Sequence, residues 1–243
     1  MQAITRELGL SETVFVIGGV ERLRIFTPAS EIPLAGHPVV GATLALSWIG
    51  RLPSRGRHVF RTGVGETPVE LADGRATMTQ AAFDPGHELD PADVAPLLAL
   101  DFGEIVGIPR VCSTTGLRQA FARVRDRATL ARLRPSLSAI EALTEIDGLV
   151  AWCEHDGELA QRFFAPAVGV DEDPATGSAA GALAALRVFE GASPGTVVVR
   201  QGDEIGRPSR IDVTVGGSPG APEDVRVGGT AVPVLEGRLV VEL

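Results

Sequence analysis

The fold is decided by the stretch LAGHPVVGATLAL at residues 34–46, which DPATGSAAGALAAL at residues 173–186 echoes about half the sequence later. The run RIFTPA precedes the first stretch and RFFAPA precedes the second, with matching residues roughly 139 positions apart. A nearly constant offset indicates a duplicated unit. Each copy is typical of a strand, a polar Gly-rich turn and a helix of small residues.

Two helix N-termini of this kind, facing one cleft, would form a pocket for an anion, because the first-turn N–H groups carry partial positive charge. The length of 243 residues suits two small lobes. We therefore expect an α+β fold of two pseudo-symmetric β-rich lobes, each with a central helix. The expected lobes are residues 1–98 and residues 99–243.

Composition excludes several classes of function. A formal net charge of -9 argues against nucleic acid or an anionic membrane as the main partner, and no apolar run approaches a membrane span. The sequence contains no Lys, Tyr or Asn, so a Schiff base and a phosphate-binding P-loop lysine are excluded. Cys112 and Cys153 lack metal-ligand spacing, and two thiols in a chain of this length favour a reducing, cytoplasmic setting.

Hydrophobic patterning and turn residues predict short strands and few helices. Strands are expected near residues 11–17, 22–27, 57–62, 67–71, 75–80, 105–111, 149–153, 159–164, 196–201, 209–215, 224–227 and 231–241. Helices are expected at residues 1–9, 38–49, 129–141 and 177–189. Residues 84–96 are expected to be a polar linker or crossing segment and residues 216–222 a flexible loop.

Five motifs follow one another along the chain: SETVFV, RIFTPASEIPLAGHPVVGAT, EDPATGSAAGALA, QGDEIGRPSRI and VRVGGTAVPVLEGRL. Together they resemble the successive motifs of the PhzF-like phenazine-biosynthesis isomerase family. The resemblance implies a diaminopimelate epimerase-like fold around a cofactor-free site. It also implies a cofactor-independent isomerase that shifts a proton at carbon of a small carboxylate-bearing metabolite.

Glu12 and His37 are the first two candidate site residues. From the residues alone, Glu12 is an ordinary carboxylate at a strand edge, whereas the resemblance implies the general acid/base. His37 precedes a helix, where it could bind a substrate carboxylate, orient the acid or simply be a satisfied histidine of the cap region.

The second motif supplies the remaining candidates. Asp173 could cap the helix that follows it or hold a polar group of the substrate. Ser178 could donate its hydroxyl or amide to the ligand, although Ser is also an ordinary residue at a helix start. Thr176 and Gly177 offer backbone N–H groups. By resemblance, Asp173, Gly177 and Ser178 bind substrate, and with Glu12 and His37 they should line the largest pocket, between the lobes.

Other conspicuous residues are given structural interpretations. Arg207 and Gly202 belong to a family motif but are expected to form a turn between two strands. The remaining histidines are isolated, so no metal site is predicted. Neither Cys112 nor Cys153 lies in a helix-start motif, which disfavours a two-thiol amino-acid racemase and leaves a single-base proton shift through Glu12.

The family normally begins with one more strand than this sequence, so the resemblance implies either that the start of the gene was assigned too late or that the protein lacks an N-terminal strand segment. Without that segment, one wall of the site is expected to be open. The alternative function is therefore a catalytically weak or inactive member that binds a small acid or serves in assembly. The expected partners are a small-molecule carboxylate substrate and a second copy in a homodimer, with no nucleic acid and no membrane.

Overall fold

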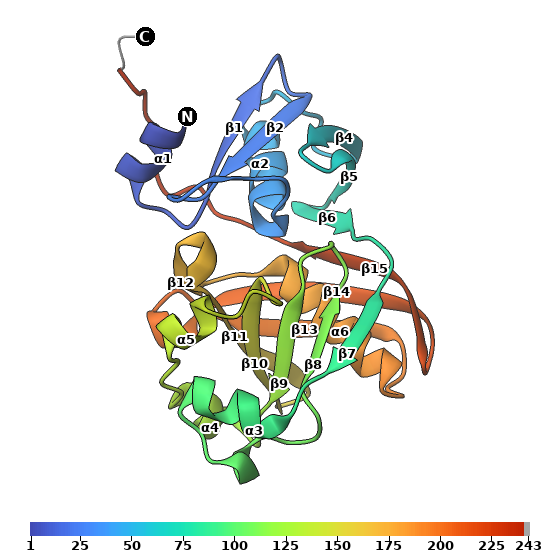
Figure 1. Ribbon diagram of the computed structural model, residues 1–243. Helices are drawn as coiled ribbons and strands as arrows, with labels where there is room; N and C mark the ends of the chain where they lie inside the picture. Colours follow the sequence, from blue (N-terminus) through green and yellow to red (C-terminus); the bar gives the residue numbers. More distant parts are fainter. Residues whose placement is uncertain (241–243) are drawn as a thin grey trace.

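The computed structural model describes residues 1–240 (Figure 1). The first half of the chain contains α1 (Gln2–Leu8), β1 (Thr13–Ile17), β2 (Arg22–Phe26), β3 (Glu31–Ile32), α2 (Gly36–Trp48), β4 (Gly56–Thr62), β5 (Gly65–Ala72) and β6 (Arg75–Thr79). The predicted helix at residues 38–49 and all five strands predicted in this half are present, with no end shifted by more than two residues.

The second half is longer and contains more short elements. They are β7 (Asp84–Glu88), α3 (Pro91–Val94), η1 (Ala95–Leu98), η2 (Phe102–Glu104), β8 (Arg110–Ser113), β9 (Gln119–Arg123), α4 (Arg127–Ala131), α5 (Leu137–Glu141), β10 (Gly148–His155), β11 (Glu158–Ala165), η3 (Pro166–Val168), β12 (Val170–Asp173), α6 (Gly177–Phe189), β13 (Gly195–Gln201), η4 (Asp203–Ile205), β14 (Ser209–Ser218) and β15 (Ala221–Gly229).

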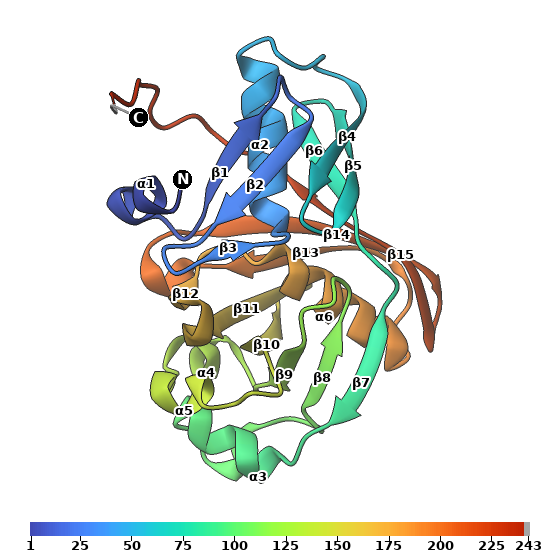
Figure 2. The ribbon, with the colours of Figure 1, turned by 45° about the horizontal axis from the view of Figure 1, so that its top comes forward.

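One continuous path of paired strands joins the two halves. Its order is β1-β2-β4-β5-β6-β15-β14-β13-β11-β10-β9-β8-β7, with β3 beside β2 and β12 beside β11. The junction is the antiparallel pair of β6 and β15, in which Thr79 faces Arg226 and Ala76 faces Gly229. Figures 1 and 2 show the two groups of strands, with β14 and β15 running between them. The mixed α+β class expected from the sequence is confirmed.

Each half packs a helix that begins at a glycine. In α2, Val39 and Leu44 are at most 1% exposed and pack among the apolar side chains of β2, β4, β5 and β6. In α6, eleven of thirteen residues are buried. Gly181 shows how close its neighbours come, since a Cβ there would lie 1.9 Å from Oε1 of Gln80. The small residues of α6 thus allow neighbouring side chains to approach the helix backbone.

Four local expectations were wrong. The predicted helix at residues 129–141 is split into α4 and α5 around Pro135, because proline disfavours helix for the residue before it. The expected strand at residues 105–111 is mostly loop, and β8 occupies Arg110–Ser113. The expected loop at residues 216–222 belongs to the β14–β15 hairpin. The expected linker at residues 84–96 contains β7 and α3.

The C-terminal strand expected at residues 231–241 is also absent over its described part, residues 231–240; Val241 lies outside the described residues. Val232, Val234 and Val240 alternate in sequence like a strand but are at least 78% exposed. A strand needs a neighbour to accept its backbone hydrogen bonds, and none of the paired strands takes this segment as a partner.

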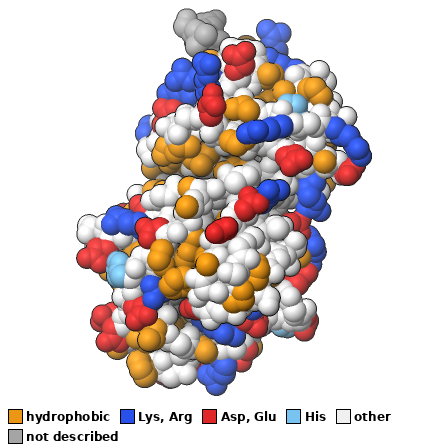
Figure 3. Space-filling model, turned by 90° about the vertical axis from the view of Figure 1, so that its right-hand side faces the viewer, with side chains coloured by type: hydrophobic (Ala, Val, Ile, Leu, Met, Phe, Trp, Pro, Cys, Tyr) orange, Lys and Arg blue, Asp and Glu red, His pale blue; other side chains and the backbone are white. Residues whose placement is uncertain are grey.

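The boundary between the expected lobes, at residues 98 and 99, remains a proposal. Residues on both sides of it share one core, since Val94, Ala95 and Leu98 pack with Phe164 and other apolar side chains of the second half. On the surface, cationic and anionic side chains are interspersed over the face drawn in Figure 3, so the net negative charge is not gathered into one patch there.

Candidate active site

The two helix starts meet where the halves adjoin, and a pocket opens beside them. A Cβ on Gly36, the first residue of α2, would lie 3.5 Å from Cα of Gly177, the first residue of α6. The two helix starts therefore lie side by side at van der Waals distance. Neither helix has a side-chain cap, so the first-turn N–H groups are available to an anion.

The pocket brings together all five site residues expected from the sequence: Glu12, His37, Asp173, Gly177 and Ser178. A water-sized molecule can reach about 120 Å³ of space inside it. Most of the remaining wall is apolar and comes from both halves, including Ile32, Leu34, Phe163, Ala165, Val168 and Val170. The arrangement suits a small molecule with one charged end and an apolar body.

This pocket is not the largest one. A neighbouring cavity, with about 460 Å³ open to water-sized molecules, shares Gly36, His37 and Gly177. Its other walls come from α2, β14, β15 and residues 230–232, together with Met78, Ala175 and Pro208. Glu12, His37, Asp173 and Ser178 share one pocket, as expected. The expectation that this pocket would be the largest was wrong. His37 alone among them lines both spaces.

Glu12 and His37 form the pair contributed by the first half. Glu12 directly precedes β1 and His37 lies in the first turn of α2, which places Nε2 of His37 3.1 Å from Oε2 of Glu12. The Glu12 side chain is 10% exposed and the His37 side chain 34% exposed. The two side chains form an ion pair when His37 is protonated, so Glu12 shares its Oε2 with the imidazole.

Burial and neighbouring charges act in opposite directions on this pair. Burial raises the pKa of Glu12. Contacts with His37 and Ser11 and the charge of Arg207 lower it by more, so the pKa of Glu12 lies below its usual value. For His37, burial lowers the pKa, whereas Glu12, Asp173 and the Ala175 backbone raise it above the usual value. Glu12 is therefore favoured as the carboxylate, and His37 stays protonated to a higher pH than an ordinary histidine.

Asp173 ends β12 and behaves differently from Glu12. It is only 4% exposed, and burial raises its pKa, with the nearby Glu12 charge adding to the rise, while His37 and Thr176 oppose it. Its Oδ2 accepts a hydrogen bond of 2.5 Å from Oγ1 of Thr176, and its Oδ1 has no partner in the described chain. Gln201 fixes this turn by donating from Nε2 to the Asp173 carbonyl oxygen at 2.6 Å.

Sequence reasoning missed two glutamines that build the second half of the site. Gln119, at the start of β9, donates from Nε2 to Oγ of Ser178 at 2.9 Å. Gln80, directly after β6, donates from Nε2 to the carbonyl oxygen of Gly177 at 3.0 Å. Both contacts join residues at least 59 positions apart in sequence, so no local pattern points to them. The only available signal was a polar residue at the edge of an apolar strand.

The family model for phenazine biosynthesis-like proteins, PhzC-PhzF, matches residues 1–237. The chain belongs to this family. A trans-2,3-dihydro-3-hydroxyanthranilate isomerase of Pseudomonas aeruginosa is 34% identical to it over 98% of this chain and 87% of that protein. A solved structure of a predicted epimerase from Pseudomonas aeruginosa is 30% identical, with a TM-score of 0.81 over 99% of this chain and 88% of its own.

The fold is also shared with a PhzF family protein of Bacillus anthracis, which has a TM-score of 0.85 and 24% identity over 99% of this chain and 88% of that structure. With relatives named as isomerases over nearly the whole chain, this family member is an isomerase of the PhzF-like type. Within residues 1–240, no helix is long and apolar enough to cross a membrane.

Both cysteines of this PhzF-like chain lie away from the pocket. Cys112 is 2% exposed and Cys153 is 0% exposed, and neither lines the site. Burial raises the pKa of the Cys153 thiol to about 11 and raises that of Cys112 still further. A thiolate nucleophile or base is therefore unfavourable at neutral pH.

Glu12, His37 and Asp173 are also the described side chains that could hold a metal ion, since one donor atom from each lies within 4.8 Å of the others. Two carboxylates and an imidazole fit a divalent cation, and they equally fit a shared proton. Only the histidines other than His37 were considered as metal ligands in the sequence, so a metal site at this cluster was not predicted. A chelator distinguishes the two uses, as described below.

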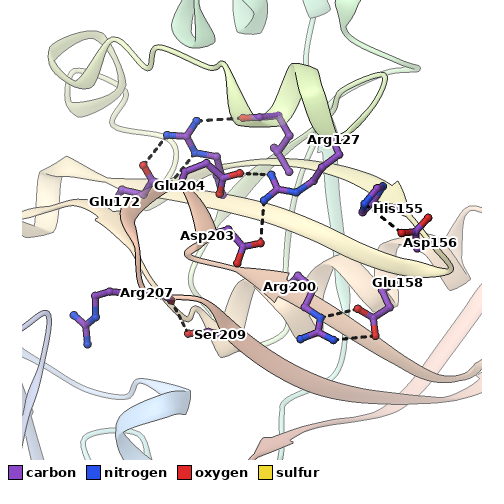
Figure 4. Close-up of polar contacts among 12 residues, drawn as sticks. Arg127, His155, Asp156, Glu158, Glu172, Arg200, Asp203, Glu204, Arg207 and Ser209 are labelled. Atoms are coloured by element: carbon purple, nitrogen blue, oxygen red, sulfur yellow. Dashed lines mark hydrogen bonds and ion pairs between the residues drawn. The ribbon is translucent and has the colours of Figure 1, made fainter.

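Arg207 directly follows a turn whose acidic residues are held by ion pairs. Arg127 forms ion pairs with both Asp203 and Glu204, and Figure 4 shows these contacts. Figure 4 also shows the Arg207 side chain extending away from that cluster with no contact drawn to an acid. The backbone of Arg207 lies in the connection between β13 and β14, as expected. Its guanidinium charge also lowers the pKa of Glu12.

Proposed function

We propose that this isomerase moves a proton between carbon atoms of a small carboxylate-bearing metabolite, with Glu12 as the general acid/base and no cofactor. The observation that carries the proposal is the opposite pKa displacement of two carboxyl groups around one imidazole: the pKa of Glu12 is lowered and that of Asp173 is raised. Acid and base roles are assigned where environments separate two titrating groups in this way.

The proposed reaction begins with the substrate carboxylate at the starts of α2 and α6, where first-turn N–H groups of Gly177 and Ser178 favour an anion. Ionised Glu12 removes a proton from carbon, and the electron pair is delocalised into a conjugated system of the substrate. His37 and Asp173, whose raised pKa values favour their protonated forms, stabilise the resulting negative charge. Glu12 then returns the proton to a different carbon on the same face, so the overall change is an isomerisation.

The test is proton exchange in deuterated solvent. Glu12→Gln should lower solvent deuterium incorporation into substrate or product by about 10²–10⁴-fold, the usual contribution of a general acid–base group. The first compound to try is trans-2,3-dihydro-3-hydroxyanthranilate, because a relative is named for acting on it. Glu21→Gln, at an exposed acid of the same half, is the matched control and should retain full exchange.

Two outcomes would contradict the proposal. Unchanged exchange in the Glu12→Gln variant would show that another residue moves the proton. Loss of the parent's activity in EDTA, with recovery on adding a divalent metal, would mean that Glu12, His37 and Asp173 act as metal ligands. An inactive small-acid-binding protein, the alternative considered from the sequence, would give no exchange with any acid that binds.

A homodimer and a cytoplasmic location are further proposals that rest on the resemblance and on the composition. Light scattering of the purified chain tests the first, and fractionation of cells that express a tagged chain tests the second.

A further inference from the structure

Two buried acceptor oxygens of pocket-lining residues have no hydrogen-bond partner within the described chain. They are Oδ1 of Asp173 and Oε1 of Gln119. A buried acceptor without a donor costs free energy, so two of them in one pocket indicate a ligand that supplies donors. Glu12 and Asp173 already have roles in the proposed reaction, whereas Gln119 has none.

The Gln119 side chain is held in one orientation. The residue is 1% exposed at the start of β9, and its Nε2 donates to Oγ of Ser178, which leaves Oε1 as the free end of the amide. Ser178 lies in the first turn of α6, so Gln119 is tied to the helix start proposed to take the substrate carboxylate. A group fixed in this way can recognise a second position on the substrate at a set distance from the carboxylate.

Burial alone does not make a glutamine a ligand-binding residue, as Gln161 demonstrates. Gln161 is equally buried and its Oε1 also has no partner, but its Nε2 donates to Gln201 and it does not line the pocket. Gln119 differs because its unpaired oxygen belongs to a side chain in the wall of the pocket that contains Glu12 and Asp173.

We infer that Gln119 is a specificity-determining residue that accepts a hydrogen bond from an amino or hydroxyl group on the ring or chain of the substrate. This inference rests on the proposed function, because it assumes that the substrate carboxylate binds at the starts of α2 and α6. This narrows the proposed substrates to small carboxylic acids that also carry an amino or hydroxyl group on their carbon framework. A site built to hydrogen-bond one group strongly rejects analogues that lack it.

The experiment compares three probe acids that differ by one donor group: benzoate, 2-aminobenzoate and 3-hydroxybenzoate. Binding to the purified chain is measured by NMR titration. In the parent, at least one donor-bearing acid should bind about 10-fold or more tightly than benzoate, the free-energy scale of one well-placed hydrogen bond to a buried group. Gln119→Leu should erase that preference, so that benzoate and the donor-bearing acids bind with equal affinity.

Gln119→Met serves as a second variant of closer shape in case Gln119→Leu fails to fold. The matched control is Thr115→Val, which removes another unpaired polar atom from the same β8–β9 connection outside this pocket. The control should keep the parent's preference.

Failure of the inference and failure of the proposed function give different results. If the parent prefers a donor-bearing acid and the Gln119 variants keep that preference, the role of Gln119 is overturned and the acid-binding pocket stands. A parent that binds the acids equally also overturns the role of Gln119. If none of the acids binds, the proposed carboxylate pocket fails, and the inference fails with it.

Discussion

The helices α2 and α6 have the same length and begin at contacting glycines, but their surroundings differ. In α2 six of thirteen residues are buried and Trp48 at its end is 46% exposed, whereas α6 buries eleven of thirteen. The side chains that the two halves bring to the site also differ in exposure. The first half contributes a partly exposed ionic pair, and the second contributes buried polar groups held by hydrogen bonds. One half is suited to proton transfer and the other to recognition.

Removing the imidazole of the first half should have the largest effect on activity after the loss of Glu12 itself. His37→Gln should lower kcat/KM by about 10²-fold, because positive charge near the developing negative charge is lost. The variant also loses two of the influences that lower the pKa of Glu12, so burial raises that pKa. Since activity needs ionised Glu12, the acid limb of the pH–rate profile should move to higher pH.

The measurement is kcat/KM as a function of pH for the parent and the variant. His87→Gln, at an exposed histidine of β7, is the control and should leave the profile in place. An acid limb that stays at the parent's pH would separate His37 from Glu12 and remove the ionic pair from the mechanism.

Matched glycines in the two helices should respond in opposite directions. A Cβ at Gly181 would lie 1.9 Å from Oε1 of Gln80 and 2.9 Å from Cγ2 of Val227, whereas Gly41 has nothing within 4 Å. Gly181→Ala should therefore lower the free energy of unfolding by about 1–3 kcal/mol through overpacking. Gly41→Ala should raise it by roughly 0.5–1 kcal/mol, because alanine favours helix.

Chemical denaturation of both variants tests this pair. Equal effects would mean that α2 and α6 are packed alike and would contradict the difference described above. Because Gln80 also holds the Gly177 carbonyl, the Gly181 variant should lose activity along with stability.

The sequence predicts the features that depend on neighbouring residues and misses those that depend on contacts between residues far apart in the chain. The helix at residues 177–189 and the site residues Glu12, His37 and Asp173 belong to local motifs, and the structure brings these three together as expected. Gln119 and Gln80 act through contacts between distant strands and helices, so no motif names them. The exposed segment 231–240 fails as a strand because strand pairing depends on a neighbour, which a hydrophobic pattern cannot specify.

Neutralising the buried acid of the second half should increase stability while it lowers activity. The pKa of Asp173 is raised above 3.8, so the unfolded chain loses this proton at lower pH than the folded chain does. Stability therefore falls as pH rises from about 4 through the folded-state pKa. Asp173→Asn should raise the free energy of unfolding at pH 7 by roughly 1 kcal/mol, or about 2–4 °C in Tm.

This gain should vanish below about pH 4, where aspartate is protonated in both states. Thermal unfolding at pH 3.5 and pH 7 gives the comparison. A variant that is less stable at pH 7 would show that the ionised carboxylate strengthens the fold, and that Asp173 is not the neutral partner of Glu12.

The smallest effect is expected at the cysteines, which both belong to the second half. Cys112 and Cys153 pack in separate apolar clusters and neither lines the pocket. Replacing both by alanine should cost on the order of 1 kcal/mol each in stability, while kcat/KM should stay within about twofold because no group that contacts substrate is removed. The measurement is deuterium exchange by the double variant beside the parent, each with and without a thiol-alkylating reagent. If the reagent abolishes the parent's exchange while the double variant resists it, or if the double variant itself loses exchange, a thiol takes part in proton transfer. The division of work between the two halves would then be wrong, since the second half would also handle the proton.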